Sequence, residues 1–202
     1  MINHFRIENK YKIELLKLDE LYKFLGDNSA NVLHPKRFIK SIYFDNAKYS
    51  SYHNSIEGTV PRKKVRIRTY SNIENFDSKN NFNLENKISS VEGRRKTVEK
   101  SIEHIKLLKQ GIYDKDYGLM FPVVEVLYSR EYYKIFNLRI TLDTKIKYKL
   151  FKENNLSISD EESILEVKSN NLDNMNYIEE NFNFMRTRFS KYCNAIERLN
   201  IT

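Results

Sequence analysis

Residues 64–70 read KVRIRTY, a stretch that alternates cationic and apolar side chains. Lys64, Arg66 and Arg68 occupy every second position, with an apolar residue between each pair. Because successive side chains of a β-strand point to opposite faces, this spacing predicts a strand with one cationic face and one apolar face. Like charges on one face repel each other. A strongly anionic ligand against that face would relieve the repulsion.

The same two-residue period recurs along most of the chain, which predicts about eight strands. The segments that show it are 5–15, 37–45, 62–70, 81–89, 94–99, 122–133, 138–144 and 163–169. Helical spacing is found at 16–26, 46–58, 98–111, 171–182 and 190–200. Many strands with helices interspersed are typical of the α+β class. The chain has 202 residues and no low-complexity linker, so we expect residues 1–202 to form a single domain.

Two architectures explain charged strand faces of this kind. An antiparallel sheet with one solvated face is the commonest cause of such alternation. A closed barrel with a charged lumen and helices packed on its outside is the alternative. The charged faces favour Arg and Lys over mixed signs, and a protein gains from repeating that repulsion only by binding an anion. We therefore predict the closed antiparallel barrel.

The overall charge of +8 favours a polyanionic partner, either nucleic acid, an anionic membrane surface or a phosphate-rich small molecule. The cations fall on alternating strand positions rather than in one basic helix or tail, which argues against nucleic acid. The single cysteine, Cys193, excludes an intramolecular disulfide and fits a reducing, cytoplasmic location. No stretch approaches the roughly 20 apolar residues of a membrane span, so we expect no integral membrane segment.

A few carboxylates share the charged strand faces. Glu8, Glu85, Asp143 and Glu166 lie among cations, where each is either an ion-pair partner or a ligand for a hard divalent cation. Together, an Arg- and Lys-rich surface with some carboxylates has the groups needed to bind a triphosphate with its metal ion.

Read in order, motifs along nearly the whole chain resemble one known family, the VTC domain. They are RIENKY (6–11), SIYFD (41–45), KVRIRTY (64–70), LENK (84–87), GRRK (93–96), VLYSREYY (126–133), LRITLDT (138–144), LEVK (165–168) and RFSKY (188–192). The VTC domain is the polyphosphate polymerase domain of the vacuolar transporter chaperone complex and its bacterial relatives. It belongs to the triphosphate tunnel metalloenzyme, or CYTH-like, superfamily.

The resemblance implies an eight-stranded antiparallel barrel whose lumen binds ATP or polyphosphate with Mn²⁺ or Mg²⁺. The activity it implies is transfer of the ATP γ-phosphate to a growing polyphosphate chain. The predicted catalytic residues are Arg66, Arg68, Lys87, Arg130, Arg139 and Glu166. The predicted substrate-binding residues are Lys10, Arg94, Lys96, Tyr128, Lys168, Arg188, Ser190 and Lys191. Glu166 is the predicted metal ligand, assisted by Glu8 or Asp143.

The chain departs from the superfamily pattern in two places. The superfamily begins with Glu-x-Glu-x-Lys, whereas Arg6 stands here in place of the first Glu. That difference weakens an interpretation as an adenylate cyclase, a thiamine triphosphatase or a related hydrolase. Arg188 stands where the family leads us to expect lysine, which keeps the charge but changes its geometry.

The sequence leaves other functions open. A hydrolase of tripolyphosphate or nucleoside triphosphate would use the same fold with water as acceptor. A non-catalytic polyphosphate-binding module is a further alternative, although Glu166 argues against it because a passive anion receptor needs no carboxylate. Any coupling to polyphosphate transport would require a membrane-protein partner. The sequence does not predict the oligomeric state.

Overall fold

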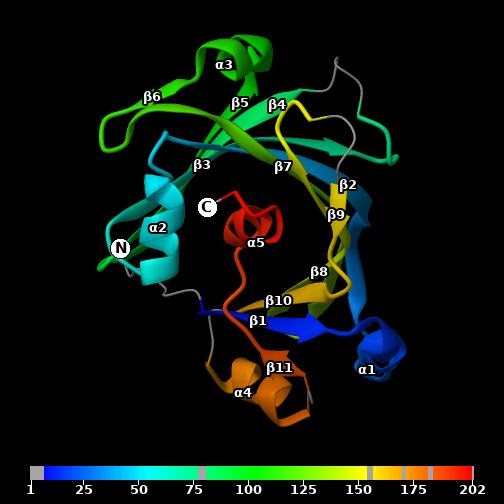
Figure 1. Ribbon diagram of the computed structural model, residues 1–202. Coiled ribbons are helices and arrows are strands. Elements are labelled where there is room, and N and C mark those ends of the chain that lie inside the picture. Colours follow the sequence, from blue (N-terminus) through cyan, green and yellow to red (C-terminus); the bar gives the residue numbers. More distant parts are fainter. Residues whose placement is uncertain (1–6, 77–80, 154–156, 170–171, 182–183, 202) are drawn as a thin grey trace. The chain divides into compact units, whose positions relative to one another are not determined.

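The computed structural model describes residues 7–76, 81–153, 157–169, 172–181 and 184–201 (Figure 1). The strands are β1 (Ile7–Ile13), β2 (Asn31–Asp45), β3 (Arg62–Ser71), β4 (Phe82–Ser90), β5 (Gly93–Ile102), β6 (Ile112–Asp114), β7 (Gly118–Ile135), β8 (Leu138–Leu150), β9 (Ser157–Ser159), β10 (Ser163–Ser169) and β11 (Met185–Arg186). The helices are a 3₁₀ turn η1 (Leu15–Lys17), α1 (Leu18–Asp27), α2 (Ser50–Glu57), α3 (His104–Gln110), α4 (Leu172–Asn181) and α5 (Lys191–Arg198). Each predicted strand and helix overlaps an observed element, which confirms the α+β class.

The prediction of a closed eight-stranded barrel is wrong. Within the described ranges the strands form one 11-stranded sheet, and its order is β11-β1-β10-β8-β7-β2-β3-β4-β5, with β6 paired to β7 and β9 to β8. The two ends of this order, β11 and β5, are not paired with each other in the described part of the chain. Side-chain alternation identifies the face on which a residue lies, but it carries no information about where the edges of a sheet go.

The helix expected over residues 98–111 begins later than its spacing predicted. Residues up to Ile102 belong to β5, where Val98 lies opposite Glu85 and Ile102 opposite Phe82. Pairing with β4 therefore overrides the local helical pattern. The helix α3 is followed by Gly111, which has φ +79° and lies so close to β7 that an added Cβ would meet the Met120 carbonyl oxygen at 2.6 Å. Only glycine fits this position without a shift.

Contacts within the chain divide it into two compact units. The first unit contains Met1–Arg37, Tyr128–Ile146 and Ser159–Phe189, and the second contains Phe38–Leu127, Lys147–Ile158 and Ser190–Thr202. Our expectation of a single domain stays a prediction, and we describe each unit by itself.

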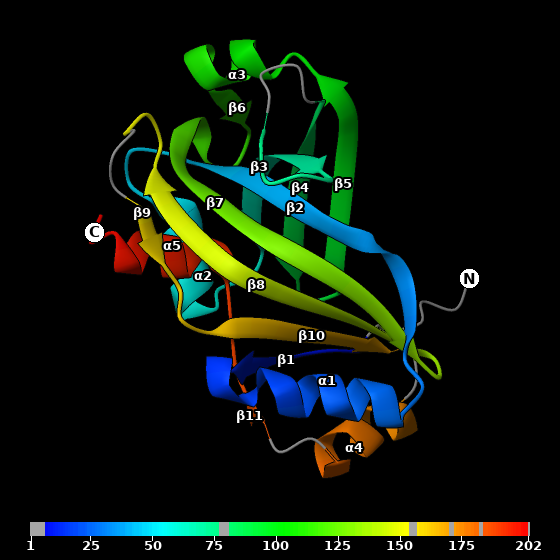
Figure 2. The ribbon, with the colours of Figure 1, turned by 90° about the vertical axis from the view of Figure 1, so that its right-hand side faces the viewer.

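The core of the first unit is formed by the apolar faces of its strands. Tyr11 lies opposite Leu165, and Leu165 opposite Leu142, so the alternating residues of β1, β10 and β8 line up across the sheet. Leu21 of α1 and Ile178 of α4 pack into the same buried cluster. Figure 2 shows α1 lying along β1. The opposite faces of these strands carry charged side chains.

In the second unit, β3 and β4 also have one buried apolar face and one charged face. Val65 and Ile67 of β3 are buried with Ile42, Phe82 and Met120. Leu107 and Leu108 of α3 and Ile112 of β6 pack against this cluster. These elements cover the apolar face, and the opposite face of β3 and β4 carries the cations.

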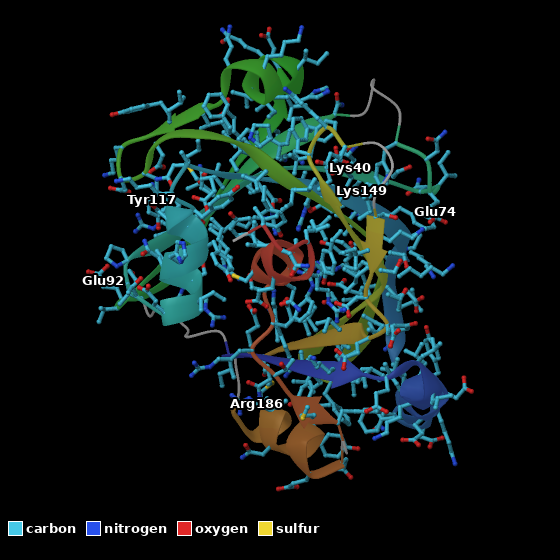
Figure 3. All side chains as sticks on the ribbon, viewed as in Figure 1. Lys40, Glu74, Glu92, Tyr117, Lys149 and Arg186 are labelled. Atoms are coloured by element: carbon cyan, nitrogen blue, oxygen red, sulfur yellow. The ribbon has the colours of Figure 1, made fainter. Side chains whose placement is uncertain are left out.

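The short helix α2 is fixed to the second unit by polar contacts. Asp45 accepts hydrogen bonds from the backbone N–H groups of Ser51 and Tyr52, both at 3.0 Å, and so caps the helix N-terminus. Tyr117, labelled beside α2 in Figure 3, accepts hydrogen bonds through its hydroxyl from Lys63 N at 3.1 Å and Asn54 Nδ2 at 3.2 Å. These contacts hold α2 against the start of β3.

Candidate functional site

The second unit carries a row of three lysines across neighbouring strands. Lys64 of β3 lies directly opposite Lys87 of β4, and Lys87 lies opposite Lys96 of β5. Two positions further along β3, on the same face, Arg66 lies opposite Glu85. Like charges in direct cross-strand register destabilise a sheet, so this row is an unusual feature for a purely structural surface.

Arg66 is held by hydrogen bonds at two sides of its guanidinium group. Its Nε and Nη2 donate to the same carboxylate oxygen of Glu85, at 2.8 and 2.6 Å, and its Nη1 donates to the Tyr43 hydroxyl at 2.9 Å. Burial alone would raise the pKa of Glu85, but the charges of Arg66 and Arg68 outweigh it and lower this pKa to about 2. Glu85 is therefore ionised at neutral pH.

Arg68 and Lys96 complete the cationic surroundings of this carboxylate. Arg68 is only 4% exposed, its Nε donates to Ser41 Oγ at 2.9 Å, and its Nη1 lies 3.7 Å from Glu85 Oε2. Lys96 donates to the other oxygen of Glu85 at 2.8 Å. Three cations thus converge on one buried anion.

Tyr43 links the arginines to helix α5. Its ring stacks on that of Tyr192, with centroids 5.2 Å apart, and the Tyr192 hydroxyl donates to Asp45 at 2.6 Å. Burial would raise the pKa of Tyr43, but Arg66 and Arg68, with a smaller contribution from Lys191, lower it from 10.0 to about 8. Tyr43 thus reports on the positive potential at this face.

We expect Tyr43 to ionise before the other tyrosines in a spectrophotometric titration, with a midpoint near pH 8. Tyrosinate is stabilised by the adjacent guanidinium groups. Because the folded-state pKa is depressed, the contribution of Tyr43 to stability is complete above pH 10 and is lost as the pH falls through about 8. The Tyr43→Phe variant should lack the early step, and Arg66→Ala should move it to higher pH. An early step that persists in Tyr43→Phe would contradict the assignment.

The N-terminal end of α5 lies against the same face. Lys64 Nζ donates to Ser190 Oγ at 3.0 Å, and Ser190 also caps α5 by accepting from the Cys193 N–H group. Lys191 is the first residue of the helix. The predicted residue Ser190 therefore contacts β3 at Lys64, and the charge of the predicted residue Lys191 acts on Tyr43, which is hydrogen-bonded to Arg66.

In the first unit, the charged face carries alternating signs rather than cations alone. Glu8 of β1 lies opposite Lys168 of β10, and Lys10 lies opposite Glu166. Lys10 Nζ is 3.7 Å from Glu8 and 3.8 Å from Glu166, while Lys168 Nζ is 3.6 Å from Glu8 and also contacts Glu166. Burial opposes ionisation of Glu166, but Lys10 and Lys168 hold its pKa well below the ordinary value. Both carboxylates thus share both lysines.

Arg130 and Asp143 form a second charged group in the first unit. The guanidinium donates through Nε and Nη2 to the two oxygens of Asp143, at 2.5 and 2.7 Å, and lies over the Tyr128 ring at 5.3 Å. Burial would lower the pKa of Arg130, but Asp143 raises it well above its ordinary value. The predicted role of Asp143 as a metal ligand stays a prediction, and the structure places it in a bidentate ion pair.

The predicted site residues thus fall into two groups, one in each unit. The second unit holds Arg66, Arg68, Lys87, Arg94, Lys96, Ser190 and Lys191. The first unit holds Glu8, Lys10, Tyr128, Arg130, Arg139, Asp143, Glu166, Lys168 and Arg188. Three of these predicted residues are exposed to solvent. Arg94 lies opposite Ser89, and Arg139 lies opposite Lys168. Arg188 lies in the segment after β11.

Two residues that contact the groups described above were not singled out from the sequence. Tyr43 and Asp45 lie at alternate positions of SIYFD, and that spacing already placed them on the polar face of the strand. Glu85 was recognised as an ion-pair or metal candidate, but its position between Arg66, Arg68 and Lys96 depends on cross-strand register. A period-two pattern in a single strand does not supply that register.

No cluster of three or more His, Cys, Asp or Glu side chains suited to a metal ion occurs within the described ranges. None of the helices in the described part of the chain is long and apolar enough to cross a membrane.

Comparisons with solved structures identify proteins of the same fold. A proposed adenylate cyclase from Vibrio parahaemolyticus is 12% identical, with 92% of this chain and 94% of that chain covered and a TM-score of 0.53. An adenylyl cyclase-like protein from Hippeastrum, described as having a dominant triphosphatase activity, is 15% identical, with 96% of both chains covered and a TM-score of 0.55. At these identities the likeness shows the fold alone. The comparison with curated proteins found no match.

The family comparison is more specific than the structural one. The model of the VTC domain matches residues 5–200, which is nearly the whole chain. This match confirms the resemblance seen in the ordered motifs. The chain therefore belongs to the VTC domain family.

Proposed function

We propose that this chain is a metal-dependent phosphotransferase that moves the γ-phosphate of ATP onto a growing polyphosphate chain. The observation that carries the proposal is the cationic face of the second unit. There, Lys64, Lys87 and Lys96 lie in register beside Arg66 and Arg68 on hydrogen-bonded strands. Such a row would bind several phosphate groups in succession, and an anion bound there would relieve the repulsion between like charges, which destabilises the sheet.

Each group of the second unit has a proposed part in binding. The guanidinium groups of Arg66 and Arg68 match the geometry of phosphate oxygens and would hold the triphosphate in one orientation. Lysines bind phosphate as point charges without fixed orientation, so the row would let a polymer shift along it. Ser190 and Lys191 would extend this surface at the N-terminus of α5.

The first unit offers a fitting pair of ligands for the metal ion. Glu8 and Glu166 both approach Lys10 and Lys168, so their carboxylates lie near each other, and the depressed pKa of Glu166 keeps it ionised. Mg²⁺ is commonly held by one or two carboxylates together with substrate phosphates, and Mn²⁺ accepts the same oxygen donors. When bound, the metal would offset negative charge on the phosphate oxygens.

The proposed reaction breaks one phosphorus–oxygen bond and forms another. A terminal oxygen of the polyphosphate attacks the γ-phosphorus of ATP, and the bond to the β,γ-bridging oxygen breaks, so that ADP leaves with the electron pair. The acceptor oxygen is already ionised and requires no general base. The protein therefore contributes positioning and charge stabilisation, which dominate phosphoryl transfer.

The experiment is incubation of the purified protein with ATP and Mn²⁺, followed by gel electrophoresis stained for polyphosphate and a parallel assay of free phosphate. We expect a ladder of polymer together with ADP, and no product when the metal is removed by a chelator. A chain that binds ATP and releases neither polymer nor phosphate would contradict catalysis and indicate a polyphosphate-binding module.

Hydrolysis is the second candidate function. It is favoured by the triphosphatase activity described for the Hippeastrum protein, which shares this fold. Water would then replace the polyphosphate oxygen as acceptor. Free phosphate without polymer in the same experiment would support this candidate over the polymerase. A cytoplasmic location and a membrane-protein partner stay predictions from the sequence.

A further inference from the structure

Glu85 is a carboxylate on the cationic face, where its negative charge works against binding a polyanion. Its side chain is 3% exposed and lies on the same strand face as the predicted phosphate contacts. It accepts hydrogen bonds from Arg66 and Lys96 and lies near Arg68. Neither the family match nor the proposed reaction assigns a role to this carboxylate.

The other carboxylate of the face is already committed elsewhere. Asp45 accepts from two backbone N–H groups of α2 and from the Tyr192 hydroxyl. The cations of the face are Arg62, Lys64, Arg66, Arg68, Lys87, Arg94 and Lys96. Glu85 is therefore the internal counterion at the centre of this group, and the cations exceed it in number.

The contacts of Glu85 are those that a phosphate oxygen would make. A carboxylate and a phosphate both accept from the Nε and Nη2 edge of arginine, and Glu85 accepts from this edge of Arg66. Lys96, which contributes the third contact, has a half-exposed side chain and can turn toward solvent or toward another anion. Cations this close together need a counterion whenever substrate is absent, because uncompensated buried charge is costly.

We propose that Glu85 is an internal competitor of the substrate, occupying the phosphate-binding edge of Arg66 in the substrate-free protein and setting the affinity of the cationic face. The inference rests on the proposed function, since it assumes that polyphosphate binds to this face. A competitor of this kind keeps the face assembled between turnovers and weakens the hold on the polymer. Product therefore leaves more readily than from a face of cations alone.

The Glu85→Gln variant separates the charge of this residue from its shape. The amide oxygen still accepts from Arg66 and keeps the guanidinium in place, while the negative charge is gone. We expect about tenfold tighter binding of tripolyphosphate than in the wild type, because one anion no longer competes. A residue that served only to orient Arg66 would leave tripolyphosphate binding unchanged or weaken it, because the amide keeps or disturbs the position of the guanidinium but removes no competitor.

The test is calorimetric titration of the wild type and two variants with tripolyphosphate at fixed ionic strength, without metal. The matched control is Glu125→Gln, which removes the same charge from the second unit in the pair with Lys40, at 2.9 Å on the opposite strand face. Its affinity should equal that of the wild type. Unchanged or weaker binding by Glu85→Gln, with a native circular dichroism spectrum, overturns the proposal.

The melting temperature provides a second readout, which remains useful even if the variant folds only in the presence of tripolyphosphate. Without ligand, Glu85→Gln should melt at a lower temperature than the wild type, and tripolyphosphate should raise its melting temperature by more. If the variant is unfolded in chloride buffer, adding tripolyphosphate should restore the fold, and failure to do so overturns the proposal. Absence of binding in the wild type and in both variants would instead contradict phosphate binding itself, and the inference would fall with it.

Discussion

Replacement of Arg66 and Arg68 together by alanine is expected to weaken tripolyphosphate binding by about 100-fold or more, since each charge-assisted contact to phosphate is worth roughly 1.5–3 kcal/mol. Both side chains lie on the same face of β3, and each is fixed at its own position, so we expect each to contribute its own contacts to the phosphate groups. The measurement is calorimetric titration in the absence of metal, which isolates phosphate binding from catalysis.

The double substitution also removes two of the cations that lie next to the buried Glu85, and the less compensated charge lowers stability. Adding Glu85→Gln to the same variant should restore the melting temperature without restoring binding. Replacement of Lys106 and Lys109 by alanine is the charge-matched control, because both are exposed on α3 over the apolar face. If the control loses as much affinity as the arginine variant, net charge rather than a site explains the binding.

Glu166→Gln is expected to lower the metal-dependent rate of phosphate transfer by about 100-fold or more, because charge stabilisation by a metal ion supplies several kcal/mol to such reactions. Binding of tripolyphosphate without metal should be retained or become tighter, since the change removes an anion near Lys10 and Lys168. The two measurements are steady-state product formation at varied Mn²⁺ and titration with tripolyphosphate in the presence of a chelator.

Glu162→Gln is the matched control for this prediction. Glu162 belongs to the first unit and pairs with Lys12 at 2.7 Å, and both side chains are partly exposed. We expect its rate and metal dependence to equal those of the wild type. A Glu166→Gln variant with the wild-type rate and an unchanged response to Mn²⁺ would remove Glu166 from the metal site.

The strands of this fold could be read from the sequence because period-two alternation is strong in each of them. KVRIRTY is a clear case, since Val65 and Ile67 are buried with the core while Lys64 and Arg66 lie on the other face. The strands that were not predicted, β6, β9 and β11, have only two or three residues each. A segment that short has no periodicity to detect, and its pairing depends on the neighbouring strand.

The candidate site was predictable in its residue types but not in its contacts. The alternation in β3 and the LEVK motif are enough to identify these cations and this carboxylate from the sequence. The balance of charge on each face could not be predicted. The first unit pairs Glu8 with Lys168 and Lys10 with Glu166, whereas the second unit aligns three lysines. Whether a cation meets a carboxylate or another cation depends on the register between strands, which a single strand does not encode.

The lysine row of β3, β4 and β5 also determines the thermodynamic character of the interaction. Three ammonium groups in register attract small anions from the surrounding solution. If polyphosphate binds this row as proposed, these anions return to bulk solvent, and their gain in translational freedom favours the association, as it does for proteins that bind nucleic acids. The logarithm of the affinity should therefore fall linearly with the logarithm of salt concentration, and the identity of the buffer anion becomes part of any measured constant.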